Sequence, residues 1–202
     1  MTFKTISSHA SYGYARISQS LDELKLLYGQ PAPSKLENYH PNKQAEFYAS
    51  RILMKSLCEE IGLPFNGIEK DEHDKPHLIA RNAHISISHA YPYIVCMIDK
   101  LQPCGIDIET PREQLIRIKR KFLNENEQEY VKENLELLCQ YWCMKEALYK
   151  IHGRKNLSLS CQLNIVPIDA NLYSGSINEN KTVETYNLKI EFLEGYFMAY
   201  NL

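Results

Sequence analysis

The sequence has no long apolar run and no cysteine framework. Its 202 residues include 6 cysteines, and no two of them have the two-residue gap of a zinc-binding or redox pair. Such sparse cysteines are not those of a disulfide scaffold. No segment approaches the roughly 18 apolar residues of a membrane span, and residues 1–20 contain no apolar core of a secretory signal. We therefore expect a cytoplasmic protein with reduced cysteines and no membrane partner.

A strong excess of either charge is also missing. The 23 basic and 25 acidic residues leave a formal net charge of −2, which disfavours a nucleic-acid partner. The chain has no Gly-rich loop of the Walker type, so a nucleotide kinase of that class is not expected. A hydrophobic content of 44% is enough for one domain or for two small packed halves.

Hydrophobic periodicity and turn residues predict a mixed chain of helices and strands. The expected order is a helix from Pro41 to Gly62, strands within 66–100, a strand at 106–109, helices at 113–122 and 125–152, and strands from 158 onward with a hairpin at Glu194 and Gly195. This order predicts an α/β (α+β) protein in two halves joined near residues 100–105.

Two acids share one face of the strand in Gly105-Ile106-Asp107-Ile108-Glu109. Strand residues two apart lie on the same side, so Asp107 and Glu109 point together while the isoleucines enter the core. Adjacent carboxylates repel each other unless a cation lies between them, and Mg²⁺ is the usual cation where a phosphate completes the ligand shell. An exposed edge strand with solvated acids is the alternative interpretation.

Trp142, Glu146 and Lys150 fall on one face of the predicted long helix, at intervals of four residues. Glu146 and Lys150 alone would make an ordinary surface pair. The only tryptophan of the chain shares their face, which favours partial burial. If this face meets the acidic strand, Glu146 completes a set of three acids and Lys150 is placed for a phosphate.

Other cations and hydroxyls are candidates for binding an anion. They are Arg51 on the first long helix, Lys75 before a proline, and Ser88 and His89 at the end of an alternating strand; each residue type also occurs in purely structural positions. The segment 112–123 interleaves basic and apolar residues, which indicates either a docking surface for an acidic protein or an ordinary amphipathic helix.

The order and spacing of these motifs resemble the 4′-phosphopantetheinyl transferase superfamily. The resemblance is carried by Lys75-Pro76, the strand ending at His89, Gly105 to Glu109, Phe122 with Glu127, and Trp142-x-x-Lys145-Glu146-Ala147-x-x-Lys150. It is closer to the type that activates peptide, polyketide and siderophore synthetases, which has two α/β halves in one chain related by a pseudo-twofold axis. The resemblance implies halves at 1–103 and 104–202, with the active site at their interface, and a monomer.

The resemblance also implies an activity and its residues. Such enzymes are holo-acyl-carrier-protein synthases: they move phosphopantetheine from coenzyme A to a serine of an apo carrier protein and release adenosine 3′,5′-bisphosphate. Asp107, Glu109 and Glu146 are expected to hold Mg²⁺, with Glu146 as the base for the serine. The remaining expected contacts to coenzyme A come from Arg51, Lys75, Ser88, His89 and Lys150, and the carrier is expected to dock on 112–123.

Two departures from the family pattern concern coenzyme A. Many members have Gly before the Lys-Pro pair and Ser after the histidine, where this chain has Asp74 and Ala90. Two alternatives to the transferase remain: a non-catalytic module that binds coenzyme A or a carrier protein on the same fold, and another Mg²⁺-dependent phosphate-ester enzyme. The three acids are all present, which favours an enzyme over the binding module.

Overall fold

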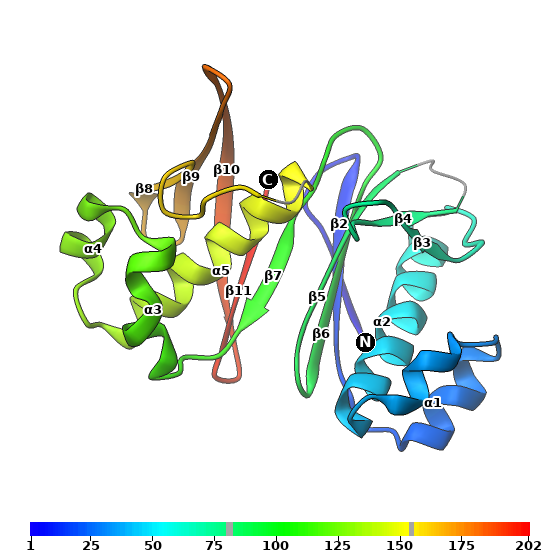
Figure 1. The fold of residues 1–202 in the computed structure, drawn as a ribbon. Coiled ribbons are helices and arrows are strands. Elements are labelled where there is room, and N and C mark those ends of the chain that lie inside the picture. Colours follow the sequence, from blue (N-terminus) through cyan, green and yellow to red (C-terminus); the bar gives the residue numbers. More distant parts are fainter. Residues whose placement is uncertain (80–82, 154–155) are drawn as a thin grey trace. The chain divides into compact units, whose positions relative to one another are not determined.

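The structure is a computed structural model that describes residues 1–79, 83–153 and 156–202. The chain forms two compact units, one of residues 1–69 and 76–102, the other of residues 70–75 and 103–202 (Figure 1). Each combines an antiparallel sheet with a long helix, so the predicted mixed α/β class is confirmed. Among the described residues, no helix has the length and apolar character needed to cross a membrane.

The first unit is a four-stranded antiparallel sheet packed against helix α2. The sheet has the order β1 (Thr2–Thr5), β2 (Ala10–Arg16), β6 (Tyr93–Asp99), β5 (His84–Ala90), and α2 spans Pro41–Glu60. The unit also contains α1 (Leu21–Tyr28), the 3₁₀ helix η1 (Ser34–Asn38) and β4 (Pro76–Leu78), which pairs with β3 (Ile68–Lys70). Leu53 and Met54 of α2 are fully buried in the core that includes Ile85 and Ile94 of the sheet.

The predicted helix from Pro41 is confirmed, together with the reason for its start. The Nδ1 atom of His40 accepts a hydrogen bond from the amide of Asn42, and Pro41 occupies the first turn, where its missing amide hydrogen costs nothing. The helix ends just before Gly62, which has a φ of +71°.

The second unit is a five-stranded antiparallel sheet with helix α5 across one face (Figure 1). Its strand order is β7 (Ile106–Glu109), β11 (Tyr196–Asn201), β10 (Thr182–Leu193), β9 (Leu172–Glu179), β8 (Leu163–Asp169). The helices are α3 (Gln114–Phe122), α4 (Glu125–Val131) and α5 (Leu135–His152). Residues Cys143, Ala147 and Leu148 of α5 are fully buried in one core with Leu188 of the sheet.

One helix boundary was predicted wrongly and one turn correctly. The single helix expected at 125–152 is broken between α4 and α5, because Lys132 adopts a φ of +53° and Asn134 starts a new helix by accepting a hydrogen bond from the amide of Leu137. The predicted hairpin is confirmed: Glu194 and Gly195 both have positive φ, as a two-residue turn between twisted strands requires.

A buried ion pair joins α4 to α5. The ammonium of Lys145, fully buried, lies 2.8 Å from Oε2 of Glu127 and donates to the carbonyl oxygens of Leu159 and Leu163. The other oxygen of Glu127 accepts from the amide of Ile165 at the start of β8. Burial lowers the pKa of Lys145, and Glu127 opposes that shift. The pair therefore fixes α5 relative to α4 and the sheet.

Gly105 allows the start of β7 to lie directly on the backbone of α5. A Cβ atom at this position would overlap the carbonyl oxygen of Ala147 and lie 2.8 Å from Cγ1 of Ile151. The amide of Gly105 also donates to the side chain of Asn201, at 2.9 Å. Because a helix backbone cannot give way as a side chain can, only glycine fits here.

Replacing Gly105 by Ala is expected to lower the free energy of unfolding by about 3 kcal/mol, because the new methyl group must push β7 away from α5. Urea unfolding followed by circular dichroism measures the change. Gly175→Ala is the matched control in the same unit, since its Cβ would meet only the ends of leucine side chains. An equal loss in both variants would contradict the backbone contact as the cause.

A second prediction concerns the buried ion pair between Glu127 and Lys145. Lys145→Met leaves a buried carboxylate without its cation, and Glu127→Gln leaves a buried ammonium without its anion, so each is expected to cost about 3 kcal/mol. The double variant is expected to lose clearly less than the sum, since neither charge is then left alone. Thermal and urea unfolding of the wild type, the two single variants and the double variant measure the losses. Strictly additive losses would refute an energetic coupling between Glu127 and Lys145.

Candidate functional site

The acidic face predicted for residues 105–109 is the inner face of β7, next to α5. Asp107 pairs in register with Ala199 of β11, and its side chain is only 5% exposed. Its Oδ1 atom accepts a hydrogen bond of 2.7 Å from Nζ of Lys150, which also donates to the carbonyl oxygen of Ile106. Strand and helix thus bring together the two residues that the sequence predicted to meet.

Glu109, two residues along the same strand, is held by two side chains. The indole Nε1 of Trp142 donates to its Oε1 at 3.2 Å, and the guanidinium of Arg112 lies 3.1 Å from its Oε2. Burial raises the pKa of Glu109, and the charge of Asp107 raises it further. The predicted face of α5 therefore does reach the acidic strand, through both its tryptophan and its lysine.

Glu146 is the third acid and lies between Trp142 and Lys150 along α5. Burial, followed by the negative charges of Asp107 and Glu109, raises the pKa of Glu146 to about 7, while Lys150 partly offsets the shift. A carboxyl group whose pKa responds to both other acids shares their electrostatic environment. The negative charges of Asp107 and Glu109 therefore influence Glu146, as the predicted shared face implies.

Trp142 contributes packing as well as its hydrogen bond. Its ring meets that of Phe122, at the end of α3, edge to face, with centroids 5.1 Å apart and an interplanar angle of 83°. This contact explains why Phe122 belongs to the motif: it fixes the indole that donates to Glu109. Lys145, three residues after Trp142 in the motif, serves the buried ion pair instead.

The three acids have the donor chemistry of a divalent-cation site. Carboxylate oxygens are the ligands that Mg²⁺ prefers, and mutual repulsion among the acids is what a cation would relieve. Asp107 and Glu109 are meanwhile paired with Lys150 and Arg112. Within residues 1–79, 83–153 and 156–202, no three His, Cys, Asp or Glu side chains are already arranged as a metal site.

Arg51, a predicted coenzyme A contact, lies along its own helix. Its guanidinium carbon is 3.6 Å from the centre of the Phe47 ring, and NH1 donates to the carbonyl oxygen of Phe47 and to the hydroxyl of Ser50. Burial lowers the pKa of Arg51. No carboxylate among the described residues forms an ion pair with it, so its charge is available to an anion.

Ser88 and His89 point to opposite faces of β5, because neighbouring strand residues alternate. His89 shares its face with Ile85 and Ile87, which pack towards the α2 core, whereas Ser88 is nearly buried on the other side. The two residues therefore cannot form one polar strand face, although both stand at the same end of the strand.

Lys75 acts as a cap for α5. Its Nζ donates to the carbonyl oxygen of Ile151 at 2.9 Å, and its stem packs on Gly153, where an added Cβ would meet it at 2.6 Å from Nζ. A cation at the C-terminus of a helix is favoured by the helix dipole. Asp74 before it has a φ of +65°, a conformation suited to the glycine that many family members have there.

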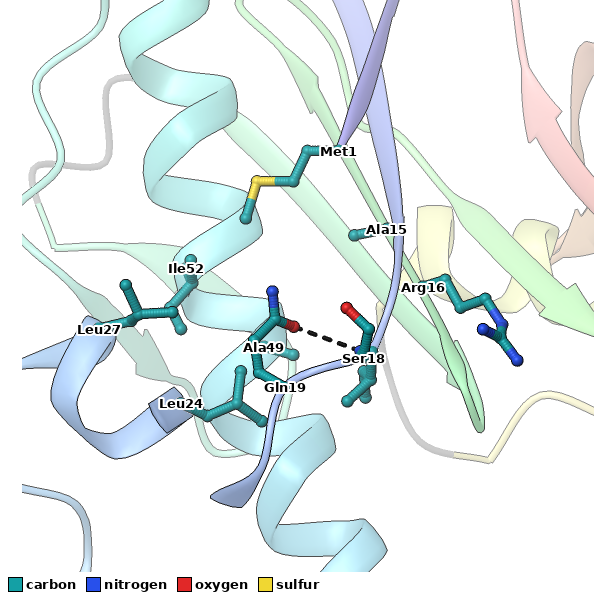
Figure 2. A pocket seen from close by; sticks show the side chains of 10 residues that line it. Met1, Ala15, Arg16, Ser18, Gln19, Leu24, Leu27, Ala49 and Ile52 are labelled. Carbon is teal, nitrogen blue, oxygen red and sulfur yellow. Dashed lines mark hydrogen bonds between the residues drawn. The ribbon is translucent and has the colours of Figure 1, made fainter. Parts of the chain in front are cut away.

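A separate pocket of about 120 Å³ lies in the first unit between β2, α1 and α2 (Figure 2). Its lining is largely apolar, with Met1, Ile17, Leu24 and Ile52 at its walls and Arg16 at its edge. None of the predicted site residues lines it, and no predicted function depended on it.

Comparison with known proteins points to the same family as the sequence motifs. Residues 103–200 match the family model of the 4′-phosphopantetheinyl transferase superfamily. The chain is 29% identical over 153 residues to the 4′-phosphopantetheinyl transferase gsp of Aneurinibacillus migulanus, which covers 72% of this chain and 62% of that protein.

Two Bacillus proteins are similar over shorter stretches. A 4′-phosphopantetheinyl transferase of Bacillus subtilis is 34% identical over 116 residues, 54% of this chain and 51% of that protein. The transferase Sfp of Bacillus subtilis strain 168 is 34% identical over 83 residues, 39% and 36% of the two chains. The matched part of the chain thus spans less than two thirds of each of these relatives. The predicted resemblance to the 4′-phosphopantetheinyl transferase superfamily is confirmed, and the family model matches the chain over residues 103–200.

Proposed function

We propose that this chain transfers the 4′-phosphopantetheine group of coenzyme A to a serine of an apo carrier protein. The observation that supports the proposal is the pairing of the acids on β7 with residues of α5, Asp107 with Lys150 and Glu109 with Trp142, inside the segment that matches the family. In the reaction the serine oxygen forms a bond to the phosphorus next to pantetheine. The bond from that phosphorus to the bridging oxygen breaks, and adenosine 3′,5′-bisphosphate leaves.

Asp107, Glu109 and Glu146 are the residues that would hold Mg²⁺. When bound, the ion supplies positive charge against the pyrophosphate and its leaving group. The acids contribute the negative charge that retains such an ion, and Lys150 and Arg112 compensate part of that charge without it. Trp142 restrains the carboxylate of Glu109 by its hydrogen bond.

Glu146 is the group we propose to take the proton of the serine hydroxyl, directly or through a water. A general base works best when its pKa is close to the working pH, and burial and the neighbouring acids raise the pKa of Glu146 to about 7. Its side chain belongs to a long helix anchored by the buried Glu127–Lys145 pair, so it is held on a rigid element.

We propose that coenzyme A is bound by the cations and polar side chains that the sequence singled out. Lys150 contacts the pyrophosphate, while Arg51, Ser88 and His89 contact phosphates of the same molecule, and Lys75 contributes positive charge from the end of α5. Arg51 is supported by its half-buried guanidinium, which has no carboxylate partner among the described residues. A single chain is proposed to carry the activity as a monomer.

The transfer itself is tested by incubating the protein with coenzyme A, Mg²⁺ and several apo carrier proteins. The expected result is a mass gain of one phosphopantetheine on at least one carrier, measured by intact mass spectrometry. Binding of coenzyme A without a mass gain on any carrier would instead support the non-catalytic module and reject the transferase.

The acids are tested by Asp107→Asn, which keeps an acceptor for Lys150 but removes the charge. Transfer is expected to fall by roughly 100-fold or more, since charge stabilisation at the pyrophosphate is lost. Emission of Trp142, the only tryptophan, is expected to change on adding Mg²⁺ because its indole bonds to Glu109. Near-full activity of Asp107→Asn at limiting Mg²⁺, or an unaltered emission response, would reject the metal assignment.

Helix α3 is the surface we propose for the carrier protein. Its apolar residues Leu115 and Phe122 are fully buried, and the opposite side exposes Arg117, Arg120 and Lys121. Lys119 is bound to the α4–α5 turn, 3.6 Å from Glu133. The exposed cations form a positive patch suited to an acidic helix of a partner.

Reversing Arg117 and Arg120 to Glu is expected to raise the KM for the carrier protein about tenfold while leaving the KM for coenzyme A unchanged. Steady-state kinetics with each substrate varied in turn measures both values. Lys25→Glu with Lys189→Glu is the control, because it makes the same change in net charge at exposed sites outside α3. An unchanged carrier KM, or an equal rise in the control, would contradict docking on α3.

A further inference from the structure

Arg112 covers both oxygens of Glu109 while much of its own side chain stays in solvent. Its NH2 group donates to Oε1 of Glu109 at 3.3 Å, and its NH1 group lies 3.1 Å from Oε2. The Arg112 side chain is 42% exposed, whereas that of Glu109 is 18% exposed. In the part of the chain that the structure describes, Arg112 forms no second ion pair, so this carboxylate alone holds its guanidinium.

Lys150, the cation of the neighbouring acid, is held more firmly. Its ammonium donates both to Oδ1 of Asp107 and to a backbone carbonyl oxygen of the same strand, and its side chain is 24% exposed. The backbone of Arg112 is fixed independently of its side chain, because its carbonyl oxygen accepts a hydrogen bond of 3.0 Å from the amide of the fully buried Leu115. The guanidinium of Arg112 can therefore turn into solvent without any movement of α3.

A divalent cation at the three acids would compete with Arg112 for Glu109. A carboxylate has about four lone-pair sites, and the two contacts of Arg112 together with the hydrogen bond from Trp142 already take up most of them. Mg²⁺ binds directly to carboxylate oxygens, and its charge repels a guanidinium close by. The indole is neutral and has no such conflict, so Arg112 is the group that must leave.

We propose that Arg112 is a displaceable counter-ion, which neutralises Glu109 in the metal-free protein and is released into solvent when Mg²⁺ binds. The inference rests on the proposed function, because it takes Asp107, Glu109 and Glu146 as the residues that hold the ion. Since binding must first break an existing pair, the affinity for Mg²⁺ is lower than the acids alone would give. Arg112 thereby sets the Mg²⁺ concentration at which the site fills.

The experiment titrates the metal-free protein with magnesium chloride alone, without coenzyme A or carrier protein, and follows the emission of Trp142, the only tryptophan. Trp142 responds to changes at Glu109 through its hydrogen bond, so the midpoint of the emission change gives the Kd for Mg²⁺. Arg112→Gln is expected to lower this Kd about fivefold, because the competing ion pair is lost. Arg112→Lys keeps the charge but cannot cover both oxygens, so its Kd is expected to lie between those of the wild type and Arg112→Gln.

Arg117→Gln is the matched control, since it removes the same charge from an exposed position of α3 that forms no ion pair among the described residues. At physiological salt, solvent ions screen the effect of such an exposed charge on a distant site. The control is therefore expected to leave the Kd for Mg²⁺ nearly unchanged. Calorimetry with the same magnesium titration gives the Kd of any variant whose emission does not respond.

Three results overturn the proposal: an unchanged Kd in Arg112→Gln, an equal fall in Arg117→Gln, or no saturable binding of Mg²⁺ by either the wild type or Arg112→Gln. A Kd of Arg112→Lys equal to that of the wild type also overturns it, because charge alone would then set the affinity. Failure of the wild type to modify any carrier rejects the proposed function separately, since the Kd for Mg²⁺ is measured without catalysis. Modified carriers with an unchanged Kd in Arg112→Gln would instead reject only the role of Arg112.

Discussion

The close approach of β7 to α5 at Gly105 is the constraint on which the second unit depends. A strand and a helix normally keep a layer of side chains between them, whereas here the strand starts against the carbonyl oxygen of Ala147. This brings Lys150, three residues farther along α5, within 2.7 Å of Asp107. With a side chain at 105, the acids on β7 would lie farther from the charged residues of α5, and the hydrogen bond between Asp107 and Lys150 would be lost.

The buried Glu127–Lys145 pair complements that contact at the other side of the helix. Gly105 sets the distance between β7 and α5, while Lys145 ties the same helix to α4 and to the segment leading into β8. The two lysines of the motif therefore divide their tasks: Lys145 faces the interior and Lys150 faces the acids. Adjacent residues Lys145 and Glu146 project on different sides of one helix, which is why a structural cation and a chemical acid can be neighbours in sequence.

Much of the candidate site follows from local periodicity. Spacing of two on a strand and of four on a helix predicted which residues share a face, and Trp142 and Lys150 do reach Glu109 and Asp107. The break between α4 and α5 was missed because it depends on the backbone of Lys132, a residue with no turn preference. No strands were assigned near the N-terminus, where β1 is mostly exposed and β2 contains Gly13, over which the ring of Phe3 lies.

The cations in the motifs were harder to interpret, because a cation can bind an anion or complete the fold. Lys75 illustrates the difficulty: only the placement of residues 70–75 with the second unit brings it to the end of α5. Arg51 shows the opposite case, since it is held by its own helix and forms no ion pair with a carboxylate among the described residues. It is restrained by the Phe47 ring and carbonyl. A group that is fixed before its ligand arrives loses less entropy on binding. The contacts of Arg51 that look structural are therefore the ones that would make this cation effective towards a phosphate.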